Sequence, residues 1–286
     1  MKKIILSITL LLLLGSQALA ETSVWKAQKG GSILYLGGTF HLLRPSDYPL
    51  PVEYEQAYRD SDLLVFETDI GKLKAPETQQ KFMQKASYRS GTTIEDYLTG
   101  DTYKNLAAYC AANGLSLDKL RQFRPSMIAL TLTLVELGKL GVSPDGVDAF
   151  FYQRSLRDKK ATAKLETVDE QIRFVTNMGE GYEDAYITYS LKDLSAIKQK
   201  YEEMVTAWKT GDEVQIEALI IDDTKKKMPV VYKELLLDRN NTWLPMIEAY
   251  AKTPQKEFIL VGVGHLVGPD GIVEALRGKG YTVEKL

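Results

Sequence analysis

The chain has 286 residues and a net charge of -2, from 36 basic and 38 acidic side chains. Apolar residues make up 44% and charged residues 26%, an ordinary globular composition that excludes disorder, collagen and coiled coil as global descriptions. The balanced charge lacks the basic excess of nucleic-acid-binding domains, so we expect no nucleic-acid partner. The single cysteine, Cys110, excludes an internal disulfide and a cysteine-built zinc site, and we expect it to be a small buried apolar group.

The first 20 residues are typical of a secretory signal peptide. Two lysines follow the initial methionine, residues 4–14 form a mostly apolar run, and Ala18 and Ala20 place small side chains before a cleavage position. The apolar run is too short to cross a bilayer as a helix of the mature protein. We therefore predict cleavage after Ala20, export to the periplasm or out of the cell, and one domain over residues 21–286 without a membrane span.

Strand patterns lie at both ends of this domain, and helix patterns lie in its middle. The N-terminal part predicts a β-hairpin of strands 24–27 and 32–36, a helix over 51–60 and an apolar strand over 63–66. Apolar spacings of three and four then predict helices over 102–113, 126–140, 148–157 and 191–209, interrupted by one strand over 162–165. After a charged turn at 222–227 we expect helices near 230–237 and 242–251, and then a strand-helix-strand unit over 258–261, 271–277 and 281–284.

These elements predict an α/β fold. Its mixed sheet is built from the N- and C-terminal strands, and a mostly helical insert occupies about residues 73–221. The strand over 258–261 is apolar throughout, so we expect the sheet to be buried on both faces.

The chain has only two histidines, His41 and His265, and both follow the same local pattern. Each stands in a G-x-x-H-L sequence directly after an apolar strand, and the carboxyl ends of strands are where α/β sheets bind ligands. Glu67 follows a third apolar strand, and an acidic group at that place has to be solvated, paired or bound to a cation. Asp69 lies one step further into the loop. We therefore predict a shared site of His41, Glu67 and His265.

Two imidazoles and a carboxylate can hold a divalent ion with open coordination positions. The first hypothesis is therefore a metal-dependent hydrolase that uses manganese, cobalt or zinc, with Glu67 as third ligand or as general base. The second hypothesis is a non-catalytic binding protein whose pocket captures a peptide, haem or a metal. The third is a metal-free esterase in which one histidine is the base and Glu67 orients it.

The same residues resemble the TraB/PrgY/GumN family, which includes the Tiki proteins, and in particular its bacterial GumN-like branch. The resemblance extends over nearly the whole mature chain and is carried by residues 38–41, 66–67 and 262–268. Supporting matches in the middle of the chain are 124–125, 146–148, 165–167 with Gln171, and 239–240 with Trp243.

This resemblance implies an α/β fold similar to that of the erythromycin-esterase and ChaN group. It also implies a metal-dependent peptidase, with manganese or cobalt favoured, that acts on a peptide or protein substrate. Carried over residue by residue, His41, Glu67 and His265 match the proposed catalytic and metal-binding residues.

Four further residues enter through the same resemblance. Arg239 and Asn240 match a motif sometimes placed near the site, although an ordinary helix start is the favoured interpretation of these two residues. For Glu166 and Asp148 the favoured interpretation is polar contacts that serve the fold, and a supporting role at the site is the alternative.

Overall fold

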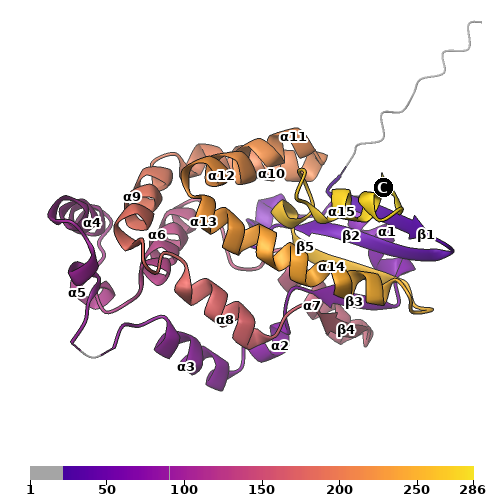
Figure 1. The fold of residues 1–286 in the computed structure, drawn as a ribbon, viewed down its shortest axis with the longest axis horizontal. Helices are drawn as coiled ribbons and strands as arrows, with labels where there is room; N and C mark the ends of the chain where they lie inside the picture. Colours follow the sequence, from indigo (N-terminus) through magenta and orange to yellow (C-terminus); the bar gives the residue numbers. More distant parts are fainter. Residues whose placement is uncertain (1–21, 90) are drawn as a thin grey trace, which may run out of the picture.

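The computed structural model describes residues 22–89 and 91–286, and the predicted signal peptide lies outside the described residues. Within them, six strands form one mixed sheet at one end of the molecule. Helices α4, α5, α6 and α9 gather at the other end, away from the sheet (Figure 1). The predicted α/β class with a mixed sheet is confirmed.

The strands are β1 (Val24–Lys29), β2 (Ser32–Thr39), β3 (Leu63–Phe66), β4 (Ala161–Lys164), β5 (Glu257–Gly262) and β6 (Thr282–Lys285), in the order β4-β3-β5-β2-β1-β6. β1 runs antiparallel to β2 and to β6, and the β1–β2 pair is the predicted hairpin. β2, β5, β3 and β4 pair in parallel. The strands β2, β5 and β3 are therefore neighbours whose carboxyl ends meet at one edge of the sheet.

The helices of the described chain cover most of the remaining residues. They are α1 (Val52–Asp60), α2 (Ile70–Leu73), α3 (Pro76–Lys85), α4 (Gly100–Ala112), α5 (Leu117–Leu120), α6 (Pro125–Lys139), α7 (Val147–Asp158), α8 (Val168–Asn177), α9 (Glu183–Leu194), α10 (Ile197–Thr210), α11 (Glu213–Ile216), α12 (Asp223–Lys227), α13 (Pro229–Tyr232), α14 (Asp238–Tyr250) and α15 (Ile272–Gly278). Two π-helical stretches, η3 (Glu217–Asp222) and η4 (Lys233–Leu237), join α11 to α12 and α13 to α14. Short 3-10 turns are η1 (Pro45–Asp47), η2 (Ile94–Tyr97) and η5 (Val263–His265).

The single helix predicted over 191–209 is wrong, because α9 ends at Leu194 and α10 starts at Ile197. The amides of Ser195 and Ala196 donate to the carbonyls three residues earlier, which tightens the chain and ends α9. Apolar periodicity continues across this break, so the pattern alone could not reveal it.

The charged turn predicted at 222–227 is also wrong, since these residues belong to a helix that includes α12. Lys227 pairs with Asp223 one turn earlier, and Lys225 donates to Asp270 at 2.9 Å. Ion pairs at i,i+4 support a helix even where the side chains are solvated. The helices predicted near 230–237 and 242–251 likewise form one run from Pro229 to Tyr250.

Within residues 22–89 and 91–286, the buried apolar side chains form two clusters. In the larger one, the ring of Phe258 on β5 packs against Tyr54 of α1 and Phe151 of α7. β5 is buried along 257–261, in agreement with the predicted sheet covered on both faces. The smaller cluster lies within the helical part and contains Cys110, which is buried as predicted.

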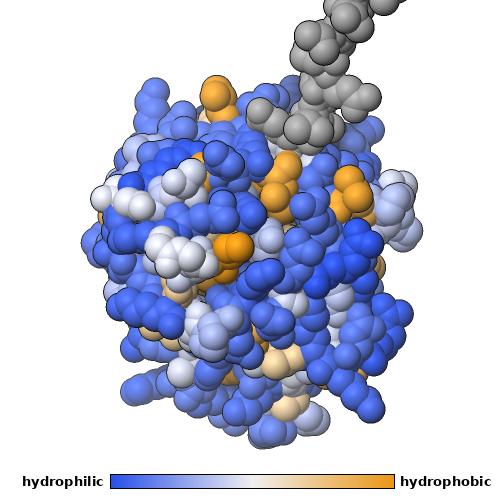
Figure 2. All heavy atoms as spheres, turned by 90° about the vertical axis from the view of Figure 1, so that its right-hand side faces the viewer, coloured by the Kyte–Doolittle hydropathy of each residue, from blue (hydrophilic) through white to orange (hydrophobic). Residues whose placement is uncertain are grey.

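The face of the molecule in Figure 2 is mostly hydrophilic, with hydrophobic side chains in separate spots. Among residues 22–89 and 91–286, none of the helices combines the length and the apolar character that a membrane crossing requires.

Candidate functional site

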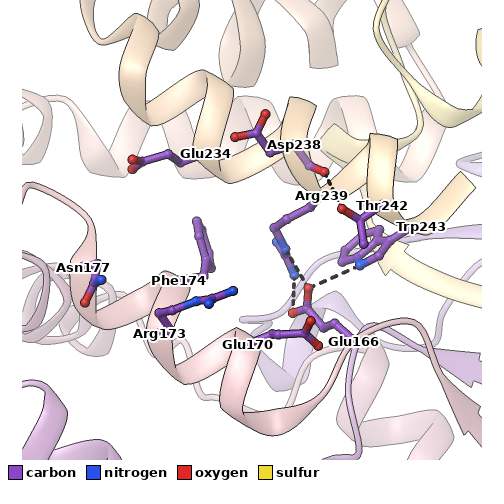
Figure 3. Close-up of a pocket in the computed structure, with 10 residues that line it drawn as sticks. All are labelled: Glu166, Glu170, Arg173, Phe174, Asn177, Glu234, Asp238, Arg239, Thr242 and Trp243. Atoms are coloured by element: carbon purple, nitrogen blue, oxygen red, sulfur yellow. Dashed lines mark hydrogen bonds and ion pairs between the residues drawn. The ribbon is translucent and has the colours of Figure 1, made fainter.

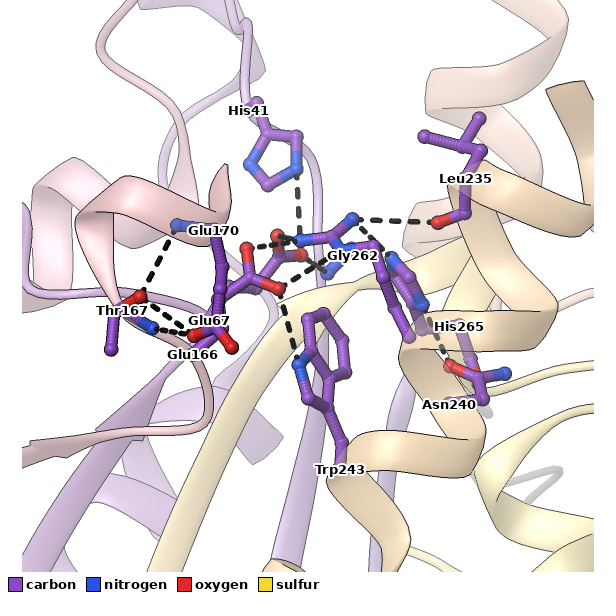
Figure 4. A network of polar contacts seen from close by, with 11 residues as sticks. His41, Glu67, Glu166, Thr167, Glu170, Leu235, Asn240, Trp243, Gly262 and His265 are labelled. Atoms are coloured by element: carbon purple, nitrogen blue, oxygen red, sulfur yellow. Dashed lines mark hydrogen bonds and ion pairs between the residues drawn. The ribbon is translucent and has the colours of Figure 1, made fainter. Parts of the chain in front are cut away.

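The shared edge of β2, β3 and β5 brings the three predicted site residues together (Figure 4). His41 lies two residues after β2, Glu67 follows β3 directly, and His265 ends the turn after β5. A Cβ at Gly262 would lie 3.3 Å from Nε2 of His41 and 3.4 Å from Oε1 of Glu67. The glycine that ends β5 thus leaves room in the space where these side chains converge.

His41 is half-exposed and is held by Asp148. Its Nδ1 and Oδ2 of Asp148 are 2.7 Å apart, and because a carboxylate only accepts, Nδ1 carries the proton. Nε2 then points toward Glu67, 3.8 Å from Oε1. Desolvation lowers the pKa of His41, but the charge and hydrogen bond of Asp148, together with the charge of Glu67, outweigh it and raise this pKa to about 9.

Asp148 reaches His41 because the start of α7 lies against the loop after β2. The amide of Val147 donates to the carbonyl of Phe40 at 3.0 Å. A Cβ at Gly146 would lie only 2.2 Å from that same carbonyl oxygen, so this close approach requires glycine. The Gly146-Val147-Asp148 match therefore has a physical explanation, since its glycine places its aspartate beside the histidine.

His265 is buried, with 4% of its surface exposed, and is held by Asn240. The amide nitrogen of Asn240 donates to two backbone carbonyls, those of His265 and Asp270, at 3.2 and 3.0 Å. Its Oδ1 must therefore face Nδ1 of His265, 2.7 Å away, so Nδ1 carries the proton and Nε2 a lone pair. Burial, with Arg239 and His41 nearby, lowers the pKa of His265 to about 3, and the imidazole is neutral.

Glu67 is a buried carboxylate with both oxygens engaged. Oε1 accepts from the amide of Gly262 at 2.8 Å, and Oε2 accepts from Nη2 of Arg239 at 2.6 Å. Burial would raise the pKa of Glu67, but Arg239, the two histidines and this amide hold it well below its usual range. As a general base Glu67 would have to give up these partners, so the geometry favours a permanent negative charge.

Arg239, at the start of α14, uses all five of its N–H groups. Nε and Nη2 donate to the two oxygens of Glu166 at 3.1 and 2.9 Å, and Nη2 also donates to Glu67. Nη1 donates to Nε2 of His265 at 3.0 Å and to the carbonyl of Leu235 at 3.4 Å. Arg239 thus connects Glu67, Glu166 and His265 in one polar network.

Aromatic rings enclose this guanidinium. The centroids of Phe174 and Trp243 lie 4.8 and 4.4 Å from the Arg239 guanidinium carbon, distances that allow cation–π attraction. The indole N–H of Trp243 also donates to Glu166 at 3.2 Å. Burial raises the pKa of Glu166, although its bonds to Arg239 oppose this. Glu166 and Trp243, which both belong to the family resemblance, therefore contact the same side chain, Arg239.

A cavity of about 340 Å³ opens beside Arg239, between α8 and the run from η4 to α14 (Figure 3). Arg239, Glu166 and Trp243 form one wall, so the cavity borders the same network that holds Glu67 and His265. Phe174 lines it as well, and no motif in the sequence singled this residue out. Its only sequence signal is its place in an amphipathic helix.

The donor set suits a divalent ion in its chemistry. Both Nδ1 atoms are held by oxygen acceptors, which leaves Nε2 of each ring as the metal-binding atom, and the carboxylate of Glu67 lies 3.8 Å from Nε2 of His41. In the described residues, however, no group of three or more His, Cys, Asp or Glu side chains is arranged to hold a metal as it stands. The guanidinium of Arg239 donates to two of the three donors, His265 and Glu67. The three side chains are thus suitable ligands for a divalent ion by their chemistry. Two of them, His265 and Glu67, accept hydrogen bonds from Arg239 at the atoms that the ion would contact.

Of the other predicted residues, Asn240 contacts His265, Glu166 contacts Arg239 and Asp148 contacts His41. Asp69 lies outside this network. Its carboxylate accepts from the amide of Lys72 and caps α2.

Fold and site together define an α/β protein with a buried cluster of histidine, glutamate and arginine at the carboxyl edge of its sheet. The chain belongs to the TraB/PrgY/gumN family, whose model matches residues 23–285.

Curated relatives of the chain include metalloproteases. It is 22% identical to metalloprotease TIKI2 of Xenopus tropicalis over 307 aligned positions, which cover 87% of the chain and 57% of the relative. Metalloprotease TIKI1 of Danio rerio is also 22% identical, over 87% of the chain and 60% of the relative. The chain therefore spans less than two thirds of the length of these relatives. No solved structure matches with comparable significance, so the resemblance to the erythromycin-esterase and ChaN fold stays a prediction.

Proposed function

We propose that this chain is an exported, metal-dependent hydrolase that cleaves a peptide or protein. His41, Glu67 and His265 would hold the ion, with manganese, cobalt and zinc as the candidate metals. The observation that carries the proposal is the pair of imidazoles near the buried carboxylate of Glu67. In each imidazole, Nδ1 is hydrogen-bonded to a side-chain oxygen, which leaves Nε2 for an ion. The metalloprotease relatives support a protein substrate.

A divalent ion at this place would supply activation of water and polarisation of the scissile carbonyl. The residues of the chain have separate tasks around it. Asp148 and Asn240 orient the two imidazoles, and Glu67 supplies a fixed negative charge in a buried setting. The half-exposed ring of His41 gives the site an open side for the substrate.

A metal-free hydrolase with His41 as base has less support from this geometry. Asp148 and Glu67 raise the pKa of His41 to about 9, so without an ion the ring is protonated at neutral pH. A protonated imidazole cannot accept a proton from water or a hydroxyl.

The test is cleavage of a fluorogenic peptide library by the purified chain with Mn²⁺, Co²⁺ or Zn²⁺. We expect turnover that a chelator abolishes and that added metal restores. His41→Ala and His265→Ala should each lower kcat/KM by about 100-fold or more, since metal-type charge stabilisation is worth several kcal/mol. Circular dichroism should show that both variants remain folded.

The matched control compares two acidic residues on one strand end. Glu67→Gln should lose activity, whereas Asp69→Asn should keep it, because asparagine also caps a helix well. Full activity of both histidine variants would contradict the proposal. Turnover that survives chelation would favour the metal-free esterase, and binding of peptide, haem or metal without turnover would favour the binding protein.

A further inference from the structure

Nε2 of His265 has one lone pair, and this lone pair accepts a hydrogen bond from Arg239. The tautomer is fixed by Asn240, so Nε2 can only accept, and Nη1 of Arg239 lies 3.0 Å away as donor. A divalent ion would need the same lone pair, since neutral imidazole ligates through its unprotonated nitrogen. Ligation of His265 and its hydrogen bond from Arg239 therefore exclude each other.

Arg239 does not depend on His265 for its position. Two bonds to Glu166 hold its Nε and Nη2, and Phe174 and Trp243 flank its plane. Nη1 also has the carbonyl of Leu235 as a second acceptor. The guanidinium can thus release His265 while most of its contacts stay in place.

We propose that Arg239 and a divalent ion are alternative partners of His265, so that Arg239 sets how tightly the chain holds its metal. This inference rests on the proposed function, because it concerns the same ligands. The permanent charge of the guanidinium beside the buried Glu67 also opposes a second cation there, since like charges repel strongly away from water. Arg239 then acts as a competitor that weakens metal binding.

The experiment is a Co²⁺ titration of the purified chain, followed by the visible absorption of cobalt and checked by elemental analysis. Arg239→Met removes the competitor, and we expect it to lower the Kd for Co²⁺ at least tenfold. Because this variant leaves Glu166 buried without its cation, the double variant Arg239→Met/Glu166→Gln is tested alongside and should show a gain of the same size. Glutamine keeps an oxygen for the indole N–H of Trp243.

Arg173→Met is the matched control, since Arg173 lines the same cavity and is exposed. Its Kd for Co²⁺ should stay within twofold of the wild-type value. Adding His265→Ala to the double variant should abolish the gain in affinity. Thermal melts of every variant establish that the proteins compared are folded.

Equal Kd values in the wild type and in the folded double variant would overturn the inference, as would a gain that survives His265→Ala. The proposed function fails by a different result, which is absence of peptide cleavage by the wild type in saturating metal. A tenfold gain in affinity without cleavage would therefore support the role of Arg239 and reject the hydrolase.

Discussion

Asn240 holds His265 from two sides. Its Oδ1 accepts from Nδ1 of the ring at 2.7 Å, and its amide nitrogen donates to the backbone carbonyl of the same residue at 3.2 Å. One side chain therefore fixes the tautomer of the imidazole and the position of the turn that carries it. This arrangement is typical of histidines that serve as metal ligands.

Replacing Asn240 by leucine should weaken the site without removing either histidine. The variant leaves Nδ1–H of His265 and two carbonyls without partners, at a cost of about 1–3 kcal/mol for each buried group that water cannot reach. We expect metal affinity to fall about 10–100-fold, the usual effect of losing such a supporting residue. Cobalt titration and urea unfolding measure the two effects.

Asn241→Leu is the control on the same helix, because Asn241 is exposed. Its stability should change by about 0.5 kcal/mol or less, and its metal affinity should not change. Equal behaviour of the two leucine variants would contradict the role given to Asn240.

The two histidines should titrate far apart in the metal-free protein. The chain has only two imidazoles, so NMR can follow each of them. His41 should lose its proton near pH 9, because Asp148 and Glu67 favour its charged form. Buried His265 should stay neutral down to about pH 3. Overlapping titrations near pH 6.5 would show that neither environment is as described.

Asp148→Asn should move the pKa of His41 downward, toward the ordinary value of 6.5, because it removes the neighbouring charge that raises it most. Asp145→Asn is the control, since Asp145 lies just before α7, three residues from Asp148, and the hydrogen bond and ion pair at Nδ1 of the ring are made by Asp148. It should leave the titration of His41 in place. The same pKa in both variants would argue against the Asp148 pair.

Much of the fold and the centre of the site could be predicted from local sequence. The Gly30-Gly31 turn lies between two strands, and apolar runs mark β3 and β5. Both G-x-x-H sequences begin in the last residues of strands that pair in parallel, so the histidines reach one edge of the sheet. These signals are local because a strand and its end are defined by a few consecutive residues.

The network around Arg239 could not be predicted in the same way. Its partners Glu67, Glu166 and His265 lie 172, 73 and 26 residues away in the chain. Helix α14 carries several polar residues in its first turns, and only packing against the sheet decides which of them points inward. Family resemblance named Arg239, but the contact with His265 became visible only in three dimensions.

The loop that carries His41 should lose stability when Asp47 is changed to asparagine. Asp47 is buried and accepts from the backbone and side chain of Arg44, while Tyr201 donates to it at 2.9 Å. Burial would raise the pKa of Asp47, but these bonds lower it below 3.8. We expect the variant to be about 1.5–3 kcal/mol less stable at pH 7, as for other hydrogen bonds to charged groups.

The pH dependence of this loss has a defined sign. A carboxyl whose pKa is lower in the folded state stabilises the protein above its unfolded pKa, near 3.8 for Asp47, and loses this effect as pH falls through its folded pKa. Urea unfolding should therefore show a large difference between wild type and Asp47→Asn at pH 7 and a small one well below pH 3.8. Glu202→Gln, at the exposed partner of Arg44, should cost about 1 kcal/mol or less at any pH.

Gly146→Ala should separate Asp148 from His41. The added Cβ would lie 2.2 Å from the carbonyl oxygen of Phe40 and 2.3 Å from the carbonyl carbon of His41, and backbone atoms cannot turn aside as side chains do. The start of α7 must therefore shift, at a cost of about 1–3 kcal/mol for overpacking. We expect lower stability, lower hydrolytic activity and a pKa of His41 nearer 6.5.

Gly138→Ala makes the same chemical change where the chain has room. Gly138 lies in α6, and a Cβ there would meet no atom within 4 Å. Because alanine favours the helix over glycine, this variant should gain about 0.5–1 kcal/mol and keep its activity and its histidine titrations. If Gly146→Ala unfolded at the same urea concentration as Gly138→Ala and kept a His41 pKa near 9, close packing of α7 on the histidine loop could not be what positions Asp148.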